Sequence, residues 1–306
     1  MNHILIDGFN LAYRAHFAFL RLSTSVGMPT GCVYGFMTGL RALKSKYPGH
    51  HITITWDKGS NRRKAMDVQY KANRPKFAST DQINDLKEIF KCVNVTQAEC
   101  AGEEADDVIA SLVKSYQNNG SQILILTSDK DLLQLVQDGK VMVIRPKKGK
   151  VPETVYDEEA VKKEMGVSPK DFETFLSFRG DDIDNIPGVP RVPSSCLINL
   201  IEKHKNIRDI YANLKDEPMT DFQRQTLKSH EERVILNNQL VKLVDTLTPD
   251  VVEGVPDEDK LNTYLKKYEF KKLTAKLYID SFADIPTFAV RTSPALESYT
   301  IFDEEA

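Results

Sequence analysis

Four carboxylates crowd into five consecutive positions of the sequence, directly before an apolar run. They belong to the stretch Gly-Glu-Glu-Ala-Asp-Asp that ends at Asp107, and the apolar run begins at Val108. Acids in the first turn of a helix complement its dipole, but one or two suffice for that. Adjacent carboxylates repel one another, and in a partly buried site they keep protons or share a cation. This stretch alone therefore leaves both a helix start and a metal site open.

Acids also follow three short apolar segments that we interpret as strands. These segments cover residues 3–6, 52–56 and 122–126, and helical patterns at residues 33–46 and 81–91 lie between them. Such alternation favours an α/β fold with a mostly parallel sheet flanked by helices. Ligands of these sheets bind outside the carboxyl ends of the strands, so we expect the acids to meet there.

A later stretch, Gly-Asp-Asp-Ile-Asp-Asn at residues 180–185, adds Asp181 and Asp184 to the candidate acids. They lie three positions apart and would face one side if the segment forms a helical turn, although its composition also fits a plain turn. All candidate ligands are oxygen donors: Asp7, Asp57, Glu104, Asp106, Asp107, Asp129, Asp131, Asp181 and Asp184. Oxygen donors without Cys or His suit Mg²⁺ or Mn²⁺ better than zinc. So many carboxylates predict two or more ions, an arrangement that suits phosphodiester chemistry.

A basic segment at residues 61–76 follows the second strand-end acid. It holds six cations and one anion, on a chain whose formal net charge is −3. Such a run is commonly a solvated face, but beside a metal cluster it would hold a phosphate backbone. Its cations are Arg62, Arg63, Lys64, Lys71, Arg74 and Lys76.

Composition narrows the classes of protein that remain. The 306 residues, 41% of them hydrophobic, suffice for one large domain or two modest ones. The N-terminus reaches an acid too early for a signal peptide, and no apolar run has membrane-spanning length, so we expect a cytoplasmic protein. Four cysteines without a CxxC pair argue against disulfides and structural zinc.

Six short blocks, taken in order, resemble the 5′-nuclease family. They are Asp-Gly at 7–8, Trp-Asp-Lys-Gly at 56–59, Tyr-Lys-Ala-Asn-Arg at 70–74, Glu-Ala-Asp-Asp at 104–107, Ser-Asp-Lys-Asp-Leu at 128–132 and Gly-Asp-x-x-Asp-Asn-Ile-Pro-Gly-Val at 180–189. That family comprises bacteriophage flap endonucleases, phage 5′→3′ exonucleases with RNase H activity, and the 5′→3′ exonuclease domain of bacterial DNA polymerase I. No polymerase domain follows within these residues, so the chain resembles the stand-alone form typical of phages.

The resemblance implies a PIN-like sheet core, a helical arch over the active site and a C-terminal helical DNA-binding region. On this basis we assign the core to residues 1–165 with an arch near 58–95, the helical region to 166–290 and a tail to 291–306. The implied activity is that of a Mg²⁺-dependent, structure-selective 5′ nuclease, with Mn²⁺ as a substitute ion, which removes DNA flaps or RNA primers during replication. RNase H activity would accompany it in some members.

The resemblance also implies roles for individual residues. Lys71 and Arg74 would stand at the base of the arch as catalytic residues, with Lys71 reaching the scissile phosphate. One metal group would consist mostly of Asp7, Asp57, Glu104, Asp106 and Asp107, and the other of Asp129, Asp131, Asp181 and Asp184.

The expected helix-hairpin-helix turn departs from the family pattern Gly-Val-Pro-Gly-Ile-Gly-x-Lys-Thr-Ala. Residues 188–197 read Gly-Val-Pro-Arg-Val-Pro-Ser-Ser-Cys-Leu, so Gly188 remains but two glycines and the lysine are absent. In the family this turn grips a potassium ion and the duplex backbone, so the departure puts that potassium site in doubt. The expected DNA contacts are Arg62, Arg63, Lys64, Lys76, Arg191, Ser194 and Ser195.

Two other functions stay open. A toxin-like metal-dependent RNase would be shorter and would lack the basic segment and the block at 180–189, whereas a non-catalytic DNA-binding factor would have lost several acids. A haloacid-dehalogenase-type phosphatase is disfavoured because Phe9 stands where its second Asp is needed. The expected partners are DNA with 5′ flaps or ends, RNA-DNA hybrids and a replication partner such as a sliding clamp, docked on the tail.

Overall fold

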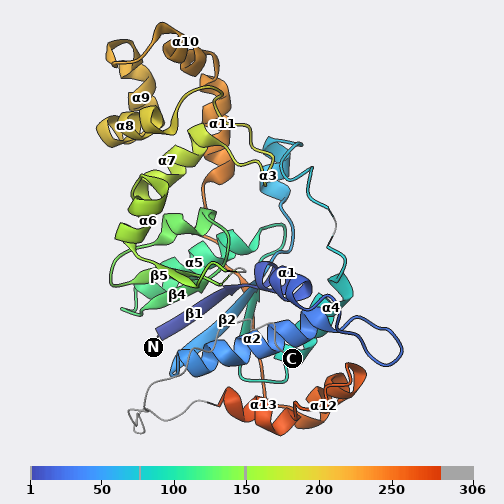
Figure 1. The fold of residues 1–306 in the computed structure, drawn as a ribbon. Coiled ribbons are helices and arrows are strands. Elements are labelled where there is room, and N and C mark those ends of the chain that lie inside the picture. Colours follow the sequence, from blue (N-terminus) through green and yellow to red (C-terminus); the bar gives the residue numbers. More distant parts are fainter. Residues whose placement is uncertain (1, 76, 148–149, 284–306) are drawn as a thin grey trace.

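A single sheet forms the centre of the computed structural model, which describes residues 2–75, 77–147 and 150–283 (Figure 1). Within these ranges the sheet has seven strands in the order β6-β5-β4-β1-β2-β3-β7. The strands are β1 (Asn2–Asp7), β2 (His50–Trp56), β3 (Thr96–Glu99), β4 (Ile123–Leu126), β5 (Val141–Arg145), β6 (Thr154–Tyr156) and β7 (Asp250–Glu253). Strands β1 to β5 run parallel, and the edge strands β6 and β7 run antiparallel to their neighbours. The predicted fold class is confirmed.

Helices cover both faces of the sheet, so the central strands are apolar on both sides. In β1, Leu5 packs into one core cluster and Ile4 and Ile6 pack into the other. The Leu5 face is covered by α5 (Ala105–Gln117), η1 (Asp131–Leu135), α6 (Glu158–Met165) and α7 (Pro169–Arg179). The opposite face carries α1 (Gly8–Ala18), α2 (Gly31–Lys46), α4 (Thr80–Phe90), α12 (Glu258–Lys267) and α13 (Ala275–Ser281). Burial on both faces is typical of parallel strands and explains why short apolar runs predicted them.

A helical lobe stands at the end of α7, away from the sheet (Figure 1). It consists of α8 (Ser194–His204), α9 (Ile207–Asn213), η2 (Leu214–Asp216), α10 (Asp221–Ser229) and α11 (Glu231–Val241). The short helix α3 (Asn61–Met66) lies beside α11, between the lobe and the sheet. No helix in the described ranges is both long and apolar enough to cross a bilayer.

The chain returns to the sheet after α11, which differs from the helical region predicted for residues 166–290. Strand β7 pairs with β3, while α12 packs against α4 and α13 against α2. The segment near residues 58–95 also differs from a complete arch, because α4 buries Ile83, Leu86 and Ile89 in the core. Short edge strands such as β7 carry too weak an apolar pattern to be found by sequence. The predicted tail at 291–306 lies outside the described residues.

Candidate active site

Asp7 and Asp57 lie at the carboxyl ends of the neighbouring strands β1 and β2, as predicted. Asp7 Oδ1 accepts the N–H of Asn10 at 3.0 Å and so caps α1, while its Oδ2 accepts the hydroxyl of Thr127 at 3.2 Å. Asp57 Oδ1 accepts the N–H of Ala105, the first residue of α5, at 2.7 Å. Both carboxylates are therefore fixed at the edge of the sheet where ligands of this fold class bind.

Glu104, the residue before α5, is the centre of a dense set of contacts. It is 4% exposed, and its carboxylate accepts Arg63 Nη1 at 2.7 Å and Lys71 Nζ at 2.6 Å. The Tyr70 hydroxyl lies 2.8 Å from Glu104 Oε2 and 3.1 Å from Asp184 Oδ2. Tyr70 was not among the predicted site residues, although it stands directly before Lys71 in the block Tyr-Lys-Ala-Asn-Arg, which could have indicated it.

Asp129 and Asp131 follow β4 in a tight turn held by local bonds. Thr127 Oγ1 accepts the N–H of Asp129 at 2.9 Å, and Asp129 Oδ1 accepts the N–H of Asp131 at 3.0 Å. Asp131 Oδ1 is buried and has no hydrogen-bond partner among the described residues. A buried polar oxygen without a partner is costly, and a bound cation would satisfy it. The donor chemistry at this position therefore fits a metal ion.

Asp181 and Asp184 lie in a closed loop, which corrects the helical turn considered from their spacing. Asp181 and Ile186 exchange two backbone hydrogen bonds, each of 2.8 Å. The loop depends on two glycines. A Cβ on Gly180 would lie 2.3 Å from Gly188 N, and one on Gly188 would lie 2.1 Å from a backbone oxygen of the preceding helix end. The close backbone crossing closes the loop at the end of α7. Lys130, in the turn after β4, lies with its Nζ 3.3 Å from Asp181 Oδ2.

Lys71 and Arg74, which the resemblance places at the base of an arch, border the carboxylates. Lys71 Nζ lies 3.6 Å from Asp184 Oδ2, and Arg74 bonds to the other oxygen of Asp184. The Lys71 N–H donates to the backbone oxygen of Asp184 at 2.9 Å, in a residue whose φ is 56°. Burial alone would lower the pKa of Lys71, but Asp184 and Glu104 raise it overall, so the ammonium keeps its charge.

The pKa values of the carboxylates show that these residues form one electrostatic cluster. Burial, followed by the charges of Asp57 and Asp129, raises the pKa of Asp7 to about 7. Burial, followed by Asp129, raises the pKa of both Asp106 and Asp131 well above the ordinary value. Each of these carboxylates would lose its proton more readily beside a cation, because positive charge lowers a carboxyl pKa.

The carboxylates do not form a ready-made cage for one ion. Within residues 2–75, 77–147 and 150–283, no group of three His, Cys, Asp or Glu side chains has an arrangement that would hold a metal ion. A hard ion such as Mg²⁺ keeps several waters and takes one or two carboxylates, so a spread cluster of acids still suits it.

The raised pKa of Asp7 predicts how the stability of the metal-free protein changes with pH. Between the ordinary value of 3.8 and about 7, folded Asp7 holds a proton that the unfolded chain has lost. Its contribution to the free energy of unfolding therefore falls as the pH rises through this interval. We expect Asp7→Asn to gain stability over the wild type as the pH rises from about 5 to about 8 in EDTA.

Denaturant titrations of both proteins at several pH values measure this difference. His3 has the opposite effect on the pH dependence of stability, because burial lowers its pKa to about 4. This effect is present in both proteins and cancels from their difference. A constant difference across the pH range would show that Asp7 is not the titrating group.

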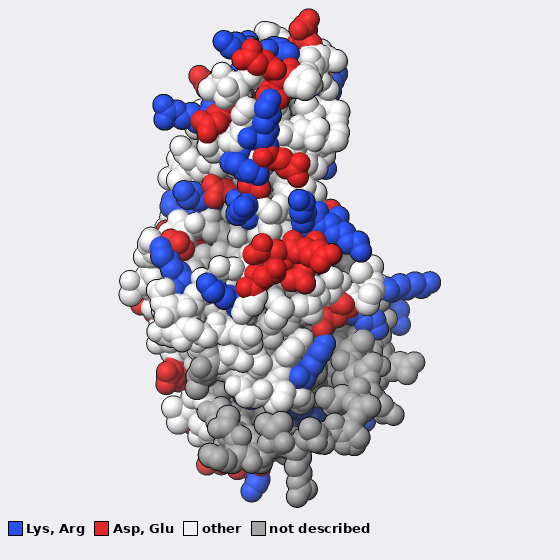
Figure 2. Space-filling model, turned by 90° about the vertical axis from the view of Figure 1, so that its left-hand side faces the viewer, with Lys and Arg blue, Asp and Glu red and all other residues white. Residues whose placement is uncertain are grey.

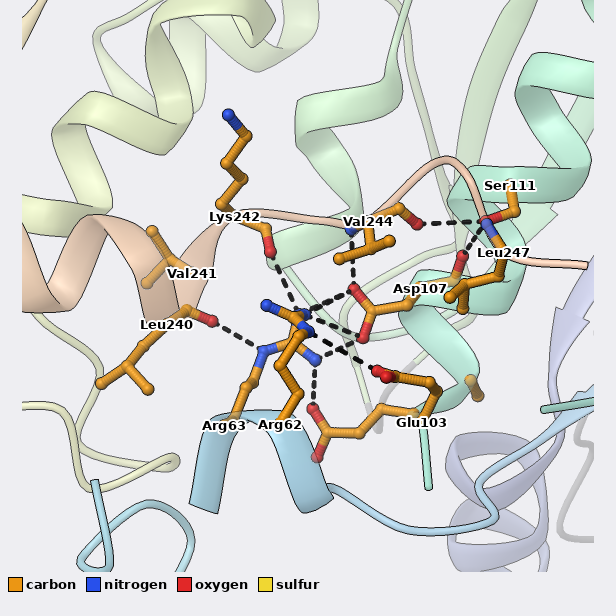
Figure 3. Close-up of polar contacts among 12 residues, drawn as sticks. Arg62, Arg63, Glu103, Asp107, Ser111, Leu240, Val241, Lys242, Val244 and Leu247 are labelled. Carbon is orange, nitrogen blue, oxygen red and sulfur yellow. Dashed lines mark hydrogen bonds and ion pairs between the residues drawn. The ribbon is translucent and has the colours of Figure 1, made fainter. Parts of the chain in front are cut away.

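Asp107 and Arg63 are placed differently from their predicted roles (Figure 3). Asp107 is fully buried and accepts Arg63 at 2.5 Å and 2.9 Å, Arg62 at 3.3 Å and the N–H of Val244 at 2.8 Å. Arg63 is 3% exposed, so no DNA phosphate can reach its guanidinium. The predicted DNA contact of Arg63 is therefore wrong. Asp107 does not suit a metal ligand, because two N–H groups of Arg63 and one each of Arg62 and Val244 take up its lone pairs, whereas among the described residues Oε1 of Glu104 accepts Lys71 alone.

The other predicted DNA contacts differ in how exposed their side chains are. Arg191, Ser194 and Ser195 are exposed at the start of α8, and Lys64 is exposed on α3. Arg62 is partly buried against Glu103 and Asp107, and Lys76 lies outside the described residues. Figure 2 shows acidic side chains gathered in one patch at the waist of the molecule, with Lys and Arg side chains directly above it. Cations next to an acidic patch are what a site for a metal and a phosphate requires.

Two family descriptions together match most of the chain. Residues 2–166 match "5′-3′ exonuclease, N-terminal resolvase-like domain", and residues 167–257 match "5′-3′ exonuclease, C-terminal SAM fold". A 5′-3′ exonuclease of Aquifex aeolicus is 34% identical over 277 residues, covering 88% of this chain and 92% of the relative. The chain belongs to the 5′-3′ exonuclease family. This confirms the predicted family and the predicted activity of a 5′ nuclease, in preference to the alternative activity of a toxin-like RNase.

Other relatives of this 5′-3′ exonuclease family member include longer proteins. DNA polymerase I of Caldicellulosiruptor bescii is 30% identical over 301 residues, which cover 95% of this chain but 35% of the polymerase. Among solved structures, the bacteriophage T5 flap endonuclease in complex with DNA and metal ions has a TM-score of 0.63 at 21% identity, covering 92% of this chain and 98% of the T5 chain. The catalytic core of Rad2 in complex with DNA substrate has a TM-score of 0.58 at 17% identity, covering 92% and 91%. These structures share the fold of this chain.

Proposed function

We propose that this 5′ nuclease depends on two or more divalent ions, with Mg²⁺ as the natural ion and Mn²⁺ as a substitute. The observation that carries the proposal is the unpartnered, buried Oδ1 of Asp131, a carboxyl whose pKa is raised by burial and by the charges of Asp129, Asp184 and Asp181. The residues that would hold the ions are Asp7, Asp57, Glu104, Asp106, Asp129, Asp131, Asp181 and Asp184. Metal ions and DNA in the T5 endonuclease complex are consistent with this.

The side chains around the carboxylates have separable roles in phosphodiester hydrolysis. When bound, the divalent ions supply positive charge that offsets charge developing on the phosphate. Lys71 and Arg74 would donate to the phosphate oxygens, since both carry charge at the border of the acidic cluster. Tyr70 bridges Glu104 and Asp184, and so holds carboxylates from the α5 start and the 181–186 loop together.

The substrate is DNA with a 5′ flap or end, gripped in part by the helical lobe. Arg191 is exposed before α8, where the first amides of the helix also point outward from its start and favour an anion. The DNA complexes of the T5 endonuclease and of Rad2 are consistent with a DNA substrate. Activity on RNA-DNA hybrids, a replication partner and a cytoplasmic location stay predictions.

A labelled 5′-flap duplex tests the proposal. We expect cleavage near the flap junction with Mg²⁺ or Mn²⁺, products with a 5′-phosphate and a 3′-hydroxyl, and no cleavage in EDTA. Single-stranded RNA of equal length serves as the control, because a toxin-like RNase would prefer it. Cleavage that persists in EDTA would contradict the metal dependence, and Mn²⁺ binding without any cleavage would indicate a non-catalytic DNA-binding factor.

A further inference from the structure

Arg63 is buried where α3, α5 and the end of α11 meet (Figure 3). Its Nε donates to Leu240 O at 2.7 Å, and its Nη2 donates to Lys242 O at 3.3 Å. The last carbonyls of a helix have no partner within the helix, and they form the negative end of its dipole. Arg63 therefore caps the C-terminal end of α11 with a positive charge, although it lies 177 positions before Leu240 in the chain.

The same guanidinium also holds the acids at the start of α5. Its Nη1 donates to Glu104 Oε2 at 2.7 Å and to Asp107 Oδ2 at 2.5 Å, and its Nη2 donates to Asp107 Oδ1 at 2.9 Å. With the carbonyls of Leu240 and Lys242 at the end of α11, these bonds occupy all five N–H donors of the side chain. Because the donors lie in one rigid plane, they fix the position of Glu104 relative to Asp107 and to the end of α11.

Contacts beside Arg63 fasten the same segments to one another. Asp107 accepts the N–H of Val244 at 2.8 Å. The Ser111 hydroxyl donates to Val244 O at 3.1 Å and accepts the N–H of Leu247 at 3.0 Å. The chain that leaves α11 is therefore bound along the first turns of α5, and a shift of α11 would move the partners of Arg63.

We infer that Arg63 is a positioning residue that sets the Glu104 carboxylate for the metal ions and couples it to the end of α11. The inference rests on the proposed function, in which Glu104 is one of the metal ligands. Glu104 Oε2 accepts both Arg63 and Tyr70, whereas Oε1 faces Lys71 at 2.6 Å. Of these partners Arg63 alone also binds Asp107 and the end of α11, so it ties the orientation of the carboxylate to them. Mutating a partner that orients a metal ligand typically lowers metal affinity by about tenfold to a hundredfold.

Direct binding of Mn²⁺, measured by electron paramagnetic resonance without DNA, tests this inference. Arg63→Lys keeps the charge but has no planar fork, so it cannot reach both carboxylates and both carbonyls. We expect it to weaken Mn²⁺ binding by about tenfold to a hundredfold. Arg62→Ala is the matched control, since Arg62 contacts the same Asp107 from the same helix and its bonds go to Asp107 and Glu103. We expect Arg62→Ala to keep the wild-type affinity.

A second variant guards against a simple loss of folding. Arg63→Gln combined with Asp107→Asn removes both charges of the buried pair together. Neither member of the pair is then left as an unpaired buried charge. We expect it to melt cooperatively and to bind Mn²⁺ as weakly as Arg63→Lys. Wild-type affinity in either folded variant would overturn the inference, as would failure of both to fold, since Arg63 would then act on the fold alone. If the wild type itself binds no Mn²⁺, the proposed function fails instead.

Discussion

Asp131→Asn is expected to lower the single-turnover rate of cleavage at saturating Mg²⁺ by about three orders of magnitude. Asp131 Oδ1 is a buried oxygen without a partner among the described residues, and the carboxylates acting on Asp131 are those of Asp129 in its own turn and of Asp181 and Asp184 in one other loop. Losing this charge removes a ligand for an ion that supplies several kcal/mol of charge stabilisation, and about 4 kcal/mol corresponds to a thousandfold change in rate. Rapid-quench kinetics on a 5′-flap substrate measure the effect.

The metal-free Asp131→Asn protein should also resist denaturant better than the wild type. Burial and the charges of Asp129 and Asp184 raise the pKa of Asp131, so the ionised carboxylate is unfavourable when no cation is bound. Asp182→Asn is the control, because Asp182 is exposed on the loop that also carries Asp184. We expect the control to keep the wild-type rate. A rate near that of the wild type for Asp131→Asn would exclude this carboxylate from the metal set.

Lys71→Ala is expected to slow cleavage by about a hundredfold to a thousandfold while changing DNA affinity much less. Its ammonium lies 2.6 Å from Glu104 Oε1, and its pKa is raised overall by Asp184 and Glu104 against the effect of burial. A charge held in this position stabilises the phosphate more in the transition state than in the bound substrate. Single-turnover rates and equilibrium DNA binding, measured on one flap substrate, separate the two effects.

Lys64→Ala provides the comparison for this prediction. Lys64 belongs to the same basic segment but is exposed on α3, so we expect its loss to weaken DNA binding and to reduce the salt dependence of binding. Its rate at saturating substrate should stay unchanged. If Lys71→Ala instead loses affinity alone and recovers the full rate at saturation, Lys71 is a binding residue of the same kind as Lys64.

The sequence by itself determined the sheet core and most of the acidic cluster. Asp7, Asp57 and Asp129 could be predicted because parallel strands all end at one edge of the sheet, so an acid after each strand needs no knowledge of distant contacts. The strands were recognisable because both of their faces are buried. The block around Lys71 then indicated where a phosphate would meet these acids.

Only the tertiary structure decided which charged residues face the site. Arg63 and Lys64 are adjacent in one basic run, yet Arg63 is buried against α11 and Lys64 is exposed. Asp106 and Asp107 are likewise adjacent, but Asp107 binds Arg63, whereas burial and the charges of Asp129 and Asp7 raise the pKa of Asp106. Neighbouring residues on a helix point in different directions, so their roles depend on what packs against each side. For Arg63 and Asp107 that partner is the end of α11, which no local pattern in the sequence brings to α3 and α5.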